Sequence, residues 1–394
     1  MRFSSNNKWI EDLECLSLEL PKRHKNLFFH KNMNEFYKEI ETLKSNVQSL
    51  DDYEIQAQIA KIVASIGDSH TWVSLPVNLL LPLELYWFCD GIYVVSTSSE
   101  YNDMMHCRIT TINGVSIDEV ISALKPIVSY ENDAFLKSQL TKYLPAIELL
   151  YGLEIVDEVD SLEVSFEDKN NDKKKLEVKS FELREAKEKL KSNINNIVSE
   201  CRLPLYRKNN DKNYWFEYLQ SFKTVYFKYK SCKDMISKSV SVFGKELIRF
   251  INENDIENVV IDMRNNSGGN SALLDPFIDN LANCGTVNKK GNLFVIVGRE
   301  TFSSALLNVF SLKEKTNAIF LGEPTGGKPN CYGEVERFSL KNSGLIICYS
   351  TKYYKIIEDD NLPSFMPDIN IELTIQNYIQ NQDPCLGYIL KTNL

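Results

Sequence analysis

Apolar and polar residues follow two different periods along the chain, which divide it into regions of different predicted structure. In the N-terminal part the apolar positions recur every three or four residues, as is typical of amphipathic helices. Asp51 and Asp52 are placed to cap one such helix, and Gly67 is placed to end it. The pattern predicts a helical subdomain over residues 1–82, with a loop from Gly67 to Thr71 just beyond a helix end.

The next region has short apolar runs of β type with helical material between them. Asn113-Gly114 is a strong signal for a tight turn between two strands. These features predict a β-rich middle segment over residues 83–180. The charged stretch 167–215 begins with EDKNNDKKK and indicates a linker or a solvent-exposed insertion, whose helical part we place at 181–221.

From residue 222 onward, apolar strands alternate with helical segments. This order is typical of an α/β domain with parallel strands and crossover helices, here over residues 222–394. Reactive groups in such sheets gather where strands reach their C-terminal ends. The predicted strands are 224–229, 259–263, 294–297 and 318–321.

Composition and charge narrow the possible functions. The 394 residues carry a net charge of −9, so the chain lacks the basic footprint expected of a protein that binds nucleic acid or anionic membranes. The first residues have no apolar signal-peptide core, and the apolar tract 73–88 is too short and too interrupted to span a bilayer. We expect a cytoplasmic protein. Its nine scattered cysteines show no zinc-type spacing and indicate free thiols.

The turn after the strand at 294–297 carries the first candidate for chemistry. Ser303 stands where a strand passes into a helix, a position that suits a nucleophile as well as an ordinary helix cap. The backbone N–H of Ser304 begins that helix. Gly268 and Gly269 follow another strand end, and their N–H groups could bind an oxyanion or could belong to a plain turn.

Histidines and lysines supply candidates for the proton acceptor. His70 lies in the Gly-Asp-Ser-His-Thr loop and has an ordinary pKa suited to a general base. His24 and His30 lie among lysines on a predicted surface helix. The tract 322–328 (GEPTGGK) fits a nucleotide-binding loop in its first part, but Pro329 stands where Ser or Thr would bind Mg²⁺, so we reject nucleotide binding.

Four motifs together resemble the S41 family of serine peptidases, which includes the C-terminal processing proteases and the tricorn core. In chain order they are 260–269 (VIDMRNNSGG), 301–305 (TFSSA), 322–328 (GEPTGGK) and 367–369 (PDI). The upstream tract 66–71 (IGDSHT) resembles the tricorn-like branch, which uses a histidine base. The resemblance implies a crotonase/ClpP-like αβ catalytic core with an N-terminal helical subdomain, and the β-rich segment would then be a degenerate PDZ-like domain.

The resemblance also implies roles for single residues. Ser303 matches the nucleophile, and the N–H groups of Ser304 and Gly269, with Gly268 beside them, match the oxyanion hole. Two positions compete for the base: Lys328, where the processing proteases keep a lysine, and His70, supported by Ser69. We favour His70 because a histidine needs no large pKa shift, whereas a lysine must be buried. The supporting acid would be Glu358, Asp359 or Asp360, of which we choose Asp360.

The sequence thus predicts a serine endopeptidase that hydrolyses proteins or oligopeptides through an acyl-enzyme on Ser303, without cofactor or metal. A homo-oligomer is one expected assembly. The alternative is a non-catalytic peptide- or ligand-binding module on the same fold, because a fold does not by itself imply an activity.

Overall fold

The computed structural model describes residues 6–197 and 203–392, which fall into two compact units. The first unit contains residues 1–131, 136–198 and 331–354, and the second contains 132–135, 199–330 and 355–394. Cys201 and part of the predicted linker lie outside the described residues. The eight described cysteines are free thiols. The division into four consecutive segments stays a prediction.

Three N-terminal helices, α1 (Asn6–Arg23), α2 (Met33–Asn46) and α3 (Asp52–Ala64), begin the first unit. The Asp51 side chain accepts hydrogen bonds from two N–H groups of α3 in a capping box, as the sequence predicts. Beyond α3, Gly67 adopts a φ of 79°, which a side chain would strain. Helix α3 therefore begins and ends close to where its sequence signals indicate.

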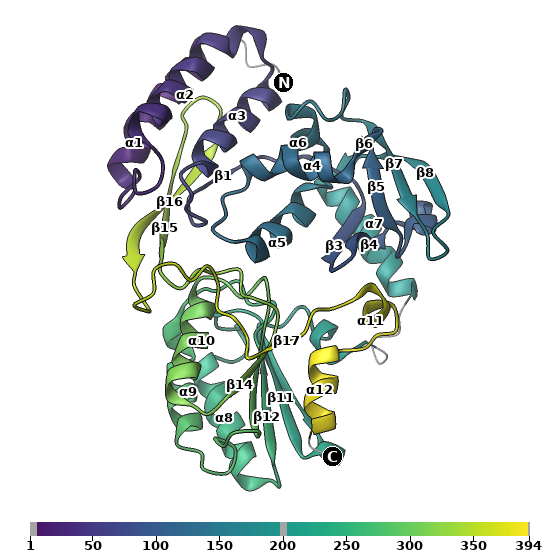
Figure 1. Cartoon of the computed structure of the whole chain (residues 1–394), viewed down its shortest axis with the longest axis vertical. Helices are drawn as coiled ribbons and strands as arrows, with labels where there is room; N and C mark the ends of the chain where they lie inside the picture. Colours follow the sequence, from purple (N-terminus) through teal and green to yellow (C-terminus); the bar gives the residue numbers. More distant parts are fainter. Residues whose placement is uncertain (1–5, 198–202, 393–394) are drawn as a thin grey trace. The chain divides into compact units, whose positions relative to one another are not determined.

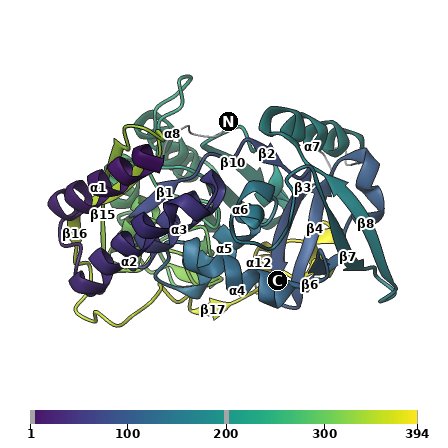
Figure 2. The same ribbon diagram turned by 90° about the horizontal axis from the view of Figure 1, so that it is seen from above.

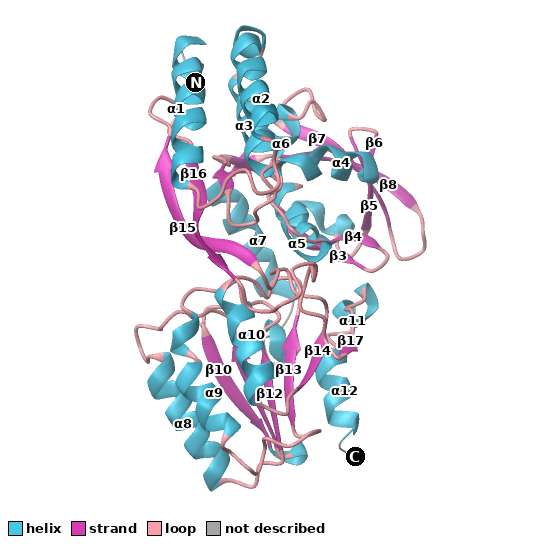
Figure 3. Ribbon diagram, turned by 60° about the vertical axis from the view of Figure 1, so that its left-hand side comes forward, coloured by secondary structure: helices cyan, strands magenta, loops and turns pink. Residues whose placement is uncertain are grey.

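A hairpin from far along the chain belongs to the same unit. Strands β15 (Cys331–Ser339) and β16 (Ile346–Tyr354) pair with each other, and β16 also pairs with β1 (Trp72–Ser74). Figure 3 shows this hairpin next to α1. The strand that follows the Gly67 loop is thus held by residues more than 270 positions away.

A second sheet of the first unit has the order β3-β4-β5-β7-β8, with β6 paired to β5. Its helix α7 lies alongside it in Figure 2. The bounds are β2 (Leu79–Leu80), β3 (Leu83–Phe88), β4 (Gly91–Thr97), β5 (Arg108–Ile112), β6 (Val115–Ser116), α4 (Ile117–Leu124), α5 (Asp133–Tyr143), α6 (Ile147–Gly152), β7 (Ser161–Glu167), β8 (Lys173–Lys179), β9 (Phe181–Glu182) and α7 (Leu183–Ile197).

The charged stretch after residue 167 corrects one expectation. Its first part is not a linker, because Lys173–Lys179 forms β8 and pairs with β7 along its whole length. Lysine is common on edge strands, and the lysines of β8 are exposed while Val178 is fully buried. High charge in a strand of this kind indicates an outer edge and not an absence of structure.

The second unit is built on a six-stranded sheet with the order β10-β11-β12-β13-β14-β17. All pairs from β11 onward are parallel, as predicted, and only β10–β11 is antiparallel. The strands are β10 (Tyr214–Leu219), β11 (Thr224–Tyr229), β12 (Asn258–Asp262), β13 (Leu293–Val297), β14 (Ile319–Gly322) and β17 (Ile369–Asn370). The helices are α8 (Val240–Glu253), α9 (Asp275–Ala282), α10 (Ser304–Lys315), α11 (Ile375–Ile379) and α12 (Pro384–Thr392).

Helices cover both faces of this sheet (Figure 1). Phe227 of β11 packs in the apolar cluster formed with α8, α9 and α10, whereas its neighbour Tyr226 packs with residues of α12. Adjacent strand residues point to opposite faces, so a sheet buried on both faces needs continuous apolar strands. All residues of β11, β12 and β13 are buried. The α/β fold class predicted from the sequence is confirmed.

None of the described helices is long and apolar enough to cross a bilayer.

Candidate active site

Ser303 has an unusual backbone conformation at the turn between β13 and α10. Its φ of 52° and ψ of −130° lie outside the regions that L-residues normally adopt. Such conformations cost on the order of 1–3 kcal/mol and cluster at functional sites. Ser303 occupies the N-cap position of α10, yet within the described residues its side chain makes no capping hydrogen bond. A simple capping role therefore does not account for this serine.

The turn is fixed by hydrogen bonds to the end of the neighbouring strand β12. The buried Thr301 donates its hydroxyl to the Met263 carbonyl at 2.9 Å and accepts from the Gly298 N–H at 3.0 Å. The Phe302 N–H donates to the Asn266 carbonyl at 3.0 Å. These bonds, made by the two residues that precede the serine, hold its strained backbone in place.

The glycine turn lies directly against Ser303. A Cβ on Gly268 would come within 2.9 Å of the Ser303 Cβ, and one on Gly269 within 2.3 Å of the Cys232 carbonyl oxygen. Both positions therefore require glycine. The Ser304 hydroxyl donates to the Gly269 carbonyl at 2.7 Å, which ties the turn to the start of α10.

The N–H groups of the two glycines differ. The Gly268 N–H donates to the side-chain oxygen of Asn266 at 3.0 Å. The Gly269 N–H donates to no acceptor within the described residues. The Ser304 N–H belongs to the first turn of α10, where N–H groups have no partner inside the helix. Gly269 and Ser304 are thus better placed than Gly268 to bind an anion.

A buried charge network lies at the root of the glycine turn. Asp262, at the end of β12, contacts Lys228 Nζ at 3.2 Å and Arg264 Nε at 3.0 Å. Arg264 also forms a paired contact, at 2.8 and 3.1 Å, with Asp383 at the start of α12. Burial opposes ionisation of Asp262, but the Arg264 and Lys228 charges outweigh it and lower its pKa to about 2.

Lys228 is a buried cation that sequence reasoning missed. It is 2% exposed, and burial lowers the pKa of its ammonium group while the Asp262 charge opposes that shift. Its Nζ also donates to Asn265, whose amide donates in turn to Glu300 in the Ser303 turn. A lysine within the apolar run 224–229 was the available signal, because such a position requires a buried partner.

The turn containing Lys328 belongs to the same unit as Ser303. The Gly327 N–H donates to the Thr301 carbonyl at 3.1 Å. A buried ion pair between Arg299 and Glu323, at 2.6 and 2.8 Å, joins this turn to the Ser303 turn. Lys328 itself is half-buried and forms no ion pair among the described residues. Its position keeps Lys328 a candidate for the base, although Lys228 is the more deeply buried lysine.

Asp360 lies in the second unit and is exposed. Its carboxylate accepts a hydrogen bond from the Asn330 amide at 2.6 Å. The Asn330 oxygen accepts the N–H groups of Ile356 and Ile357. Through Asn330, Asp360 therefore stabilises a loop within the second unit. Glu358 and Asp359 are likewise exposed.

The His70 loop lies in the first unit and is built around the buried carboxylate of Asp68. Asp68 accepts the His70 backbone N–H at 2.9 Å on one oxygen. Its other oxygen accepts His24 Nε2 at 3.0 Å, Ser350 Oγ at 2.7 Å and Thr71 Oγ1 at 2.5 Å. The expectation that His24 lies on the surface is wrong, because His24 is buried as a partner of Asp68.

Burial and hydrogen bonding set the charge states in this loop. Burial raises the pKa of Asp68, but hydrogen bonds from His24, Ser350 and Thr71 outweigh it and hold that pKa below its ordinary value. Burial lowers the pKa of His70, and the nearby Asp68 charge opposes this shift only partly. His70 is therefore neutral at neutral pH, which is the form that can accept a proton.

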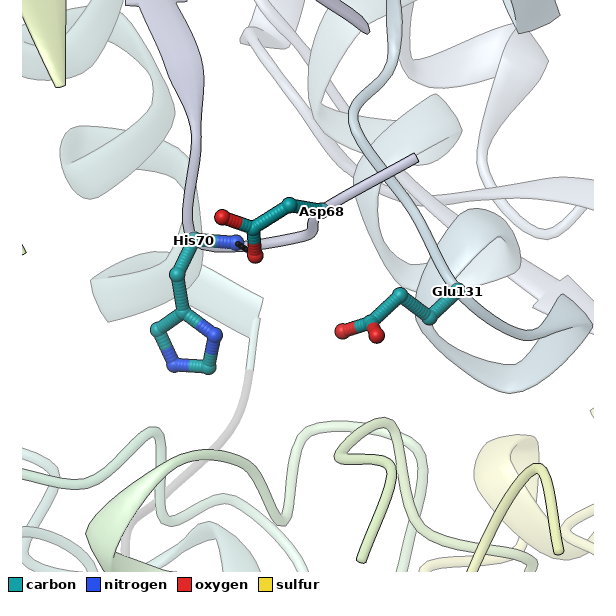
Figure 4. A group of neighbouring side chains, drawn as sticks. All are labelled: Asp68, His70 and Glu131. Atoms are coloured by element: carbon teal, nitrogen blue, oxygen red, sulfur yellow. Dashed lines mark hydrogen bonds between the residues drawn. The ribbon is translucent and has the colours of Figure 1, made fainter. Parts of the chain in front are cut away.

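Glu131 also lies near His70 and was not identified from the sequence. The Ser69 hydroxyl donates to Glu131 Oε2 at 2.6 Å. Figure 4 shows the Glu131 carboxylate directed toward the imidazole ring of His70. Potential ligand atoms of Asp68, His70 and Glu131 all lie within 4.8 Å of one another. The tract around Glu131 carries no motif, so only the fold could reveal this neighbour.

Two carboxylates and an imidazole form a set that could also bind a divalent cation. The donor arrangement argues otherwise. Asp68 already accepts four hydrogen bonds, three of them on Oδ2, which leaves its carboxylate little capacity for a metal ion. The hydrogen-bonded loop accounts for this cluster better than a metal site does.

The structure thus groups the predicted site residues into two sets. Ser303, Ser304, Gly268 and Gly269 lie together in the second unit, which also holds Lys328 and Asp360. Ser69 and His70 lie in the first unit with Glu131.

Comparison with solved structures finds a similar fold in CPAF. Mature CPAF complexed with lactacystin has a TM-score of 0.67 and 12% identity, covering 98% of each chain. Mature CPAF alone gives a TM-score of 0.66 and 13% identity over 98% of this chain and 96% of CPAF. The tricorn protease gives a TM-score of 0.45 at 13% identity, over 98% of this chain and 36% of its own.

No protein-family model matches the chain, and no curated protein matches it by sequence. At such low identity the likeness concerns the fold alone. The α/β fold that the S41-like motifs imply is confirmed by the likeness to CPAF, whereas the PDZ-like character of the β-rich segment stays a prediction.

Proposed function

We propose that this chain is a serine peptidase of the S41 type, with Ser303 as its nucleophile. The observation that carries the proposal is the strained Ser303 backbone, held against a turn in which two glycines are sterically required. Backbone strain at an element junction is costly, and it persists where it serves a site. The CPAF-like fold and the ordered motifs support the same conclusion.

The proposed reaction is acyl transfer to water. Ser303 Oγ attacks the carbonyl carbon of a peptide bond while His70 accepts its proton. The N–H groups of Gly269 and Ser304 bind the resulting oxyanion. The C–N bond then breaks, His70 returns the proton to the leaving amine, and water hydrolyses the Ser303 ester by the same path in reverse.

The nucleophile is tested with purified protein on casein and peptide libraries and with a serine-reactive phosphonate probe. Ser303→Ala should lower the rate on the order of 10⁶-fold and abolish labelling. Ser239→Ala is the matched control, because Ser239 also precedes a helix and caps α8. Activity that survives Ser303→Ala would exclude this nucleophile. A wild-type protein that binds peptides tightly and never reacts would favour the binding-module alternative.

Lactacystin, the compound with which mature CPAF is complexed, offers a second readout. We propose that lactacystin binds this chain at Ser303 and protects it from the phosphonate probe. We expect lactacystin to protect the wild type and the Ser239→Ala variant equally from the probe. We expect Ser303→Ala to lose lactacystin binding.

The base is tested by comparing His70→Ala with Lys328→Ala. We propose His70, because burial keeps its imidazole neutral and Lys328 is only half-buried. His70→Ala should cost far more activity than Lys328→Ala. Loss of activity only in Lys328→Ala would make the lysine the base.

A further inference from the structure

The loop that carries His70 has two carboxylates beside it, and they are used differently. Asp68 is fully buried and accepts four hydrogen bonds, one of them from the His70 backbone N–H. Its carboxylate therefore fixes the course of the loop. Glu131 is half-buried and approaches from another segment, just before α5.

Glu131 is anchored to the loop through Ser69. The 2.6 Å contact between Ser69 Oγ and Glu131 Oε2 is short, as expected when a hydroxyl donates to a charged carboxylate. A carboxylate has about four lone-pair sites, so this bond leaves Glu131 capacity for another donor. Its side chain is directed at the His70 ring (Figure 4).

We infer that Glu131 is the positioning carboxylate of His70, the role that the sequence assigned to Asp360. The inference rests on the proposed function. A carboxylate on one side of an imidazole favours the tautomer whose other nitrogen is free to accept a proton, and it stabilises the imidazolium that forms. Separations up to 4.8 Å suit either one bridging water or a direct contact that tightens when substrate binds.

Asp360 is a poorer candidate for this role. It is exposed, and its short contact with Asn330 gives it a structural task within the second unit. Glu131, by contrast, lies in the same unit as His70. It accepts a hydrogen bond from Ser69 in the loop that carries His70. Among the described residues of the first unit, the titratable groups near His70 include Asp68 and Glu131, with His24 bound to Asp68.

The test compares Glu131→Gln, Asp360→Asn and the exposed control Glu158→Gln in the full chain. Glu131→Gln should lower kcat at least 10²-fold with little change in KM, because it alters the proton acceptor and not substrate contacts. The acid limb of the kcat/KM profile should move to lower pH, because the imidazolium loses a stabilising charge. Glu131→Asp should recover part of the rate, and Glu158→Gln should match wild type.

A second readout does not require catalysis. The chain has four histidines, so the His70 imidazole signal can be assigned by NMR through its loss in His70→Asn. Glu131→Gln should lower the pKa measured for His70, with or without EDTA present. The inference would be overturned if the His70 titration were unchanged in Glu131→Gln or if it depended on EDTA. It would also be overturned if Asp360→Asn lost more activity than Glu131→Gln.

The two proposals fail in different ways. If Ser303→Ala leaves activity intact, the proposed function is wrong, yet the NMR titration still tests whether Glu131 acts on His70. If Ser303 and His70 are essential and Glu131→Gln behaves as wild type, the peptidase proposal stands and only the role of Glu131 is wrong.

Discussion

Two buried aspartates, Asp262 and Asp68, hold the two loops that carry the candidate chemistry, but their charges are compensated differently. Asp262 in the second unit is compensated by two cations, Lys228 and Arg264. Asp68 in the first unit is compensated mainly by hydroxyl, imidazole and backbone donors. Both side chains are 0% exposed, and both pKa values are lowered.

The difference teaches what each loop requires. Ion pairs compensate a buried charge without requiring a precise direction of approach. Those of Asp262 and Arg264 connect the glycine turn to β11 and to the start of α12. Hydrogen bonds are directional, and those of Asp68 orient the individual groups of the His70 loop. We therefore expect the Asp262 network to act chiefly on stability and the Asp68 network to act more strongly on activity.

The largest effect should come from breaking the ion network. Asp262→Ala leaves Lys228 and Arg264 buried without their shared partner, which costs about 3–5 kcal/mol of the free energy of unfolding. Urea denaturation of the second unit measures this loss. The double variant Lys228→Met/Asp262→Asn should be less destabilised than the sum of its single variants, and strict additivity would contradict the coupling.

A smaller loss of stability should follow from Asp68→Asn. The carboxamide offers one acceptor oxygen where four donors now converge, which costs about 2 kcal/mol. Activity should fall more than this destabilisation explains, because the backbone N–H of His70 loses its acceptor and the loop that carries the imidazole is no longer fixed. Thermal unfolding and kcat measured below the transition separate the two effects. Proportional losses of stability and activity would argue that Asp68 is only structural.

Acid should distinguish the two units. The lowered pKa of His70 favours its neutral form in the folded state, so stability is lost as pH falls below the unfolded value of about 6.5. The lowered pKa of Asp262 acts only as pH falls from about 4 toward 2, and is worth about 2–3 kcal/mol there.

Denaturation midpoints between pH 7 and pH 3 check this order. The first unit should weaken near pH 6, and His70→Asn should remove most of that loss. The second unit should keep its midpoint until pH 4. An identical acid profile in His70→Asn and wild type would remove His70 as the cause.

A still smaller loss of stability should come from Asp383→Asn. Asp383 pairs with Arg264 and also accepts the N–H groups of Cys385 and Leu386 at the start of α12. Asparagine keeps the capping bonds and loses the charge, so we expect about 1 kcal/mol, measured by urea unfolding. Asp279→Asn, which breaks only an exposed pair with Lys315, should cost less. Equal costs would show that burial adds nothing to the Asp383 pair.

Much of the second unit could be predicted because its signals are local. The apolar runs at 224–229 and 294–297 lie within one or two residues of β11 and β13, and the Ser303 turn stands at the predicted junction of strand and helix. Parallel pairing follows from alternating strands and helices. The strain at Ser303 could not be predicted, because serine does not require a positive φ.

The candidate base loop could be predicted only in part. Its place beyond a helix end followed from Gly67, but its buried partners did not. His24 and Ser350 stand 44 and 282 positions from Asp68, and Glu131 stands 62 positions from Ser69. The lysines around His24 in the sequence favour a surface position, and only the path of the chain shows that its ring is buried.

The sequence by itself determined the alternation of strands and helices in the second unit, the candidate nucleophile and glycine turns, and the family resemblance, because periodicity and turn chemistry depend on neighbouring residues. The tertiary structure alone decided that the 331–354 hairpin joins the N-terminal helices, that Lys228 and His24 are buried, and that Glu131 faces His70. These outcomes depend on which distant segments share a core and on which donor meets each buried carboxylate, and no local pattern encodes either.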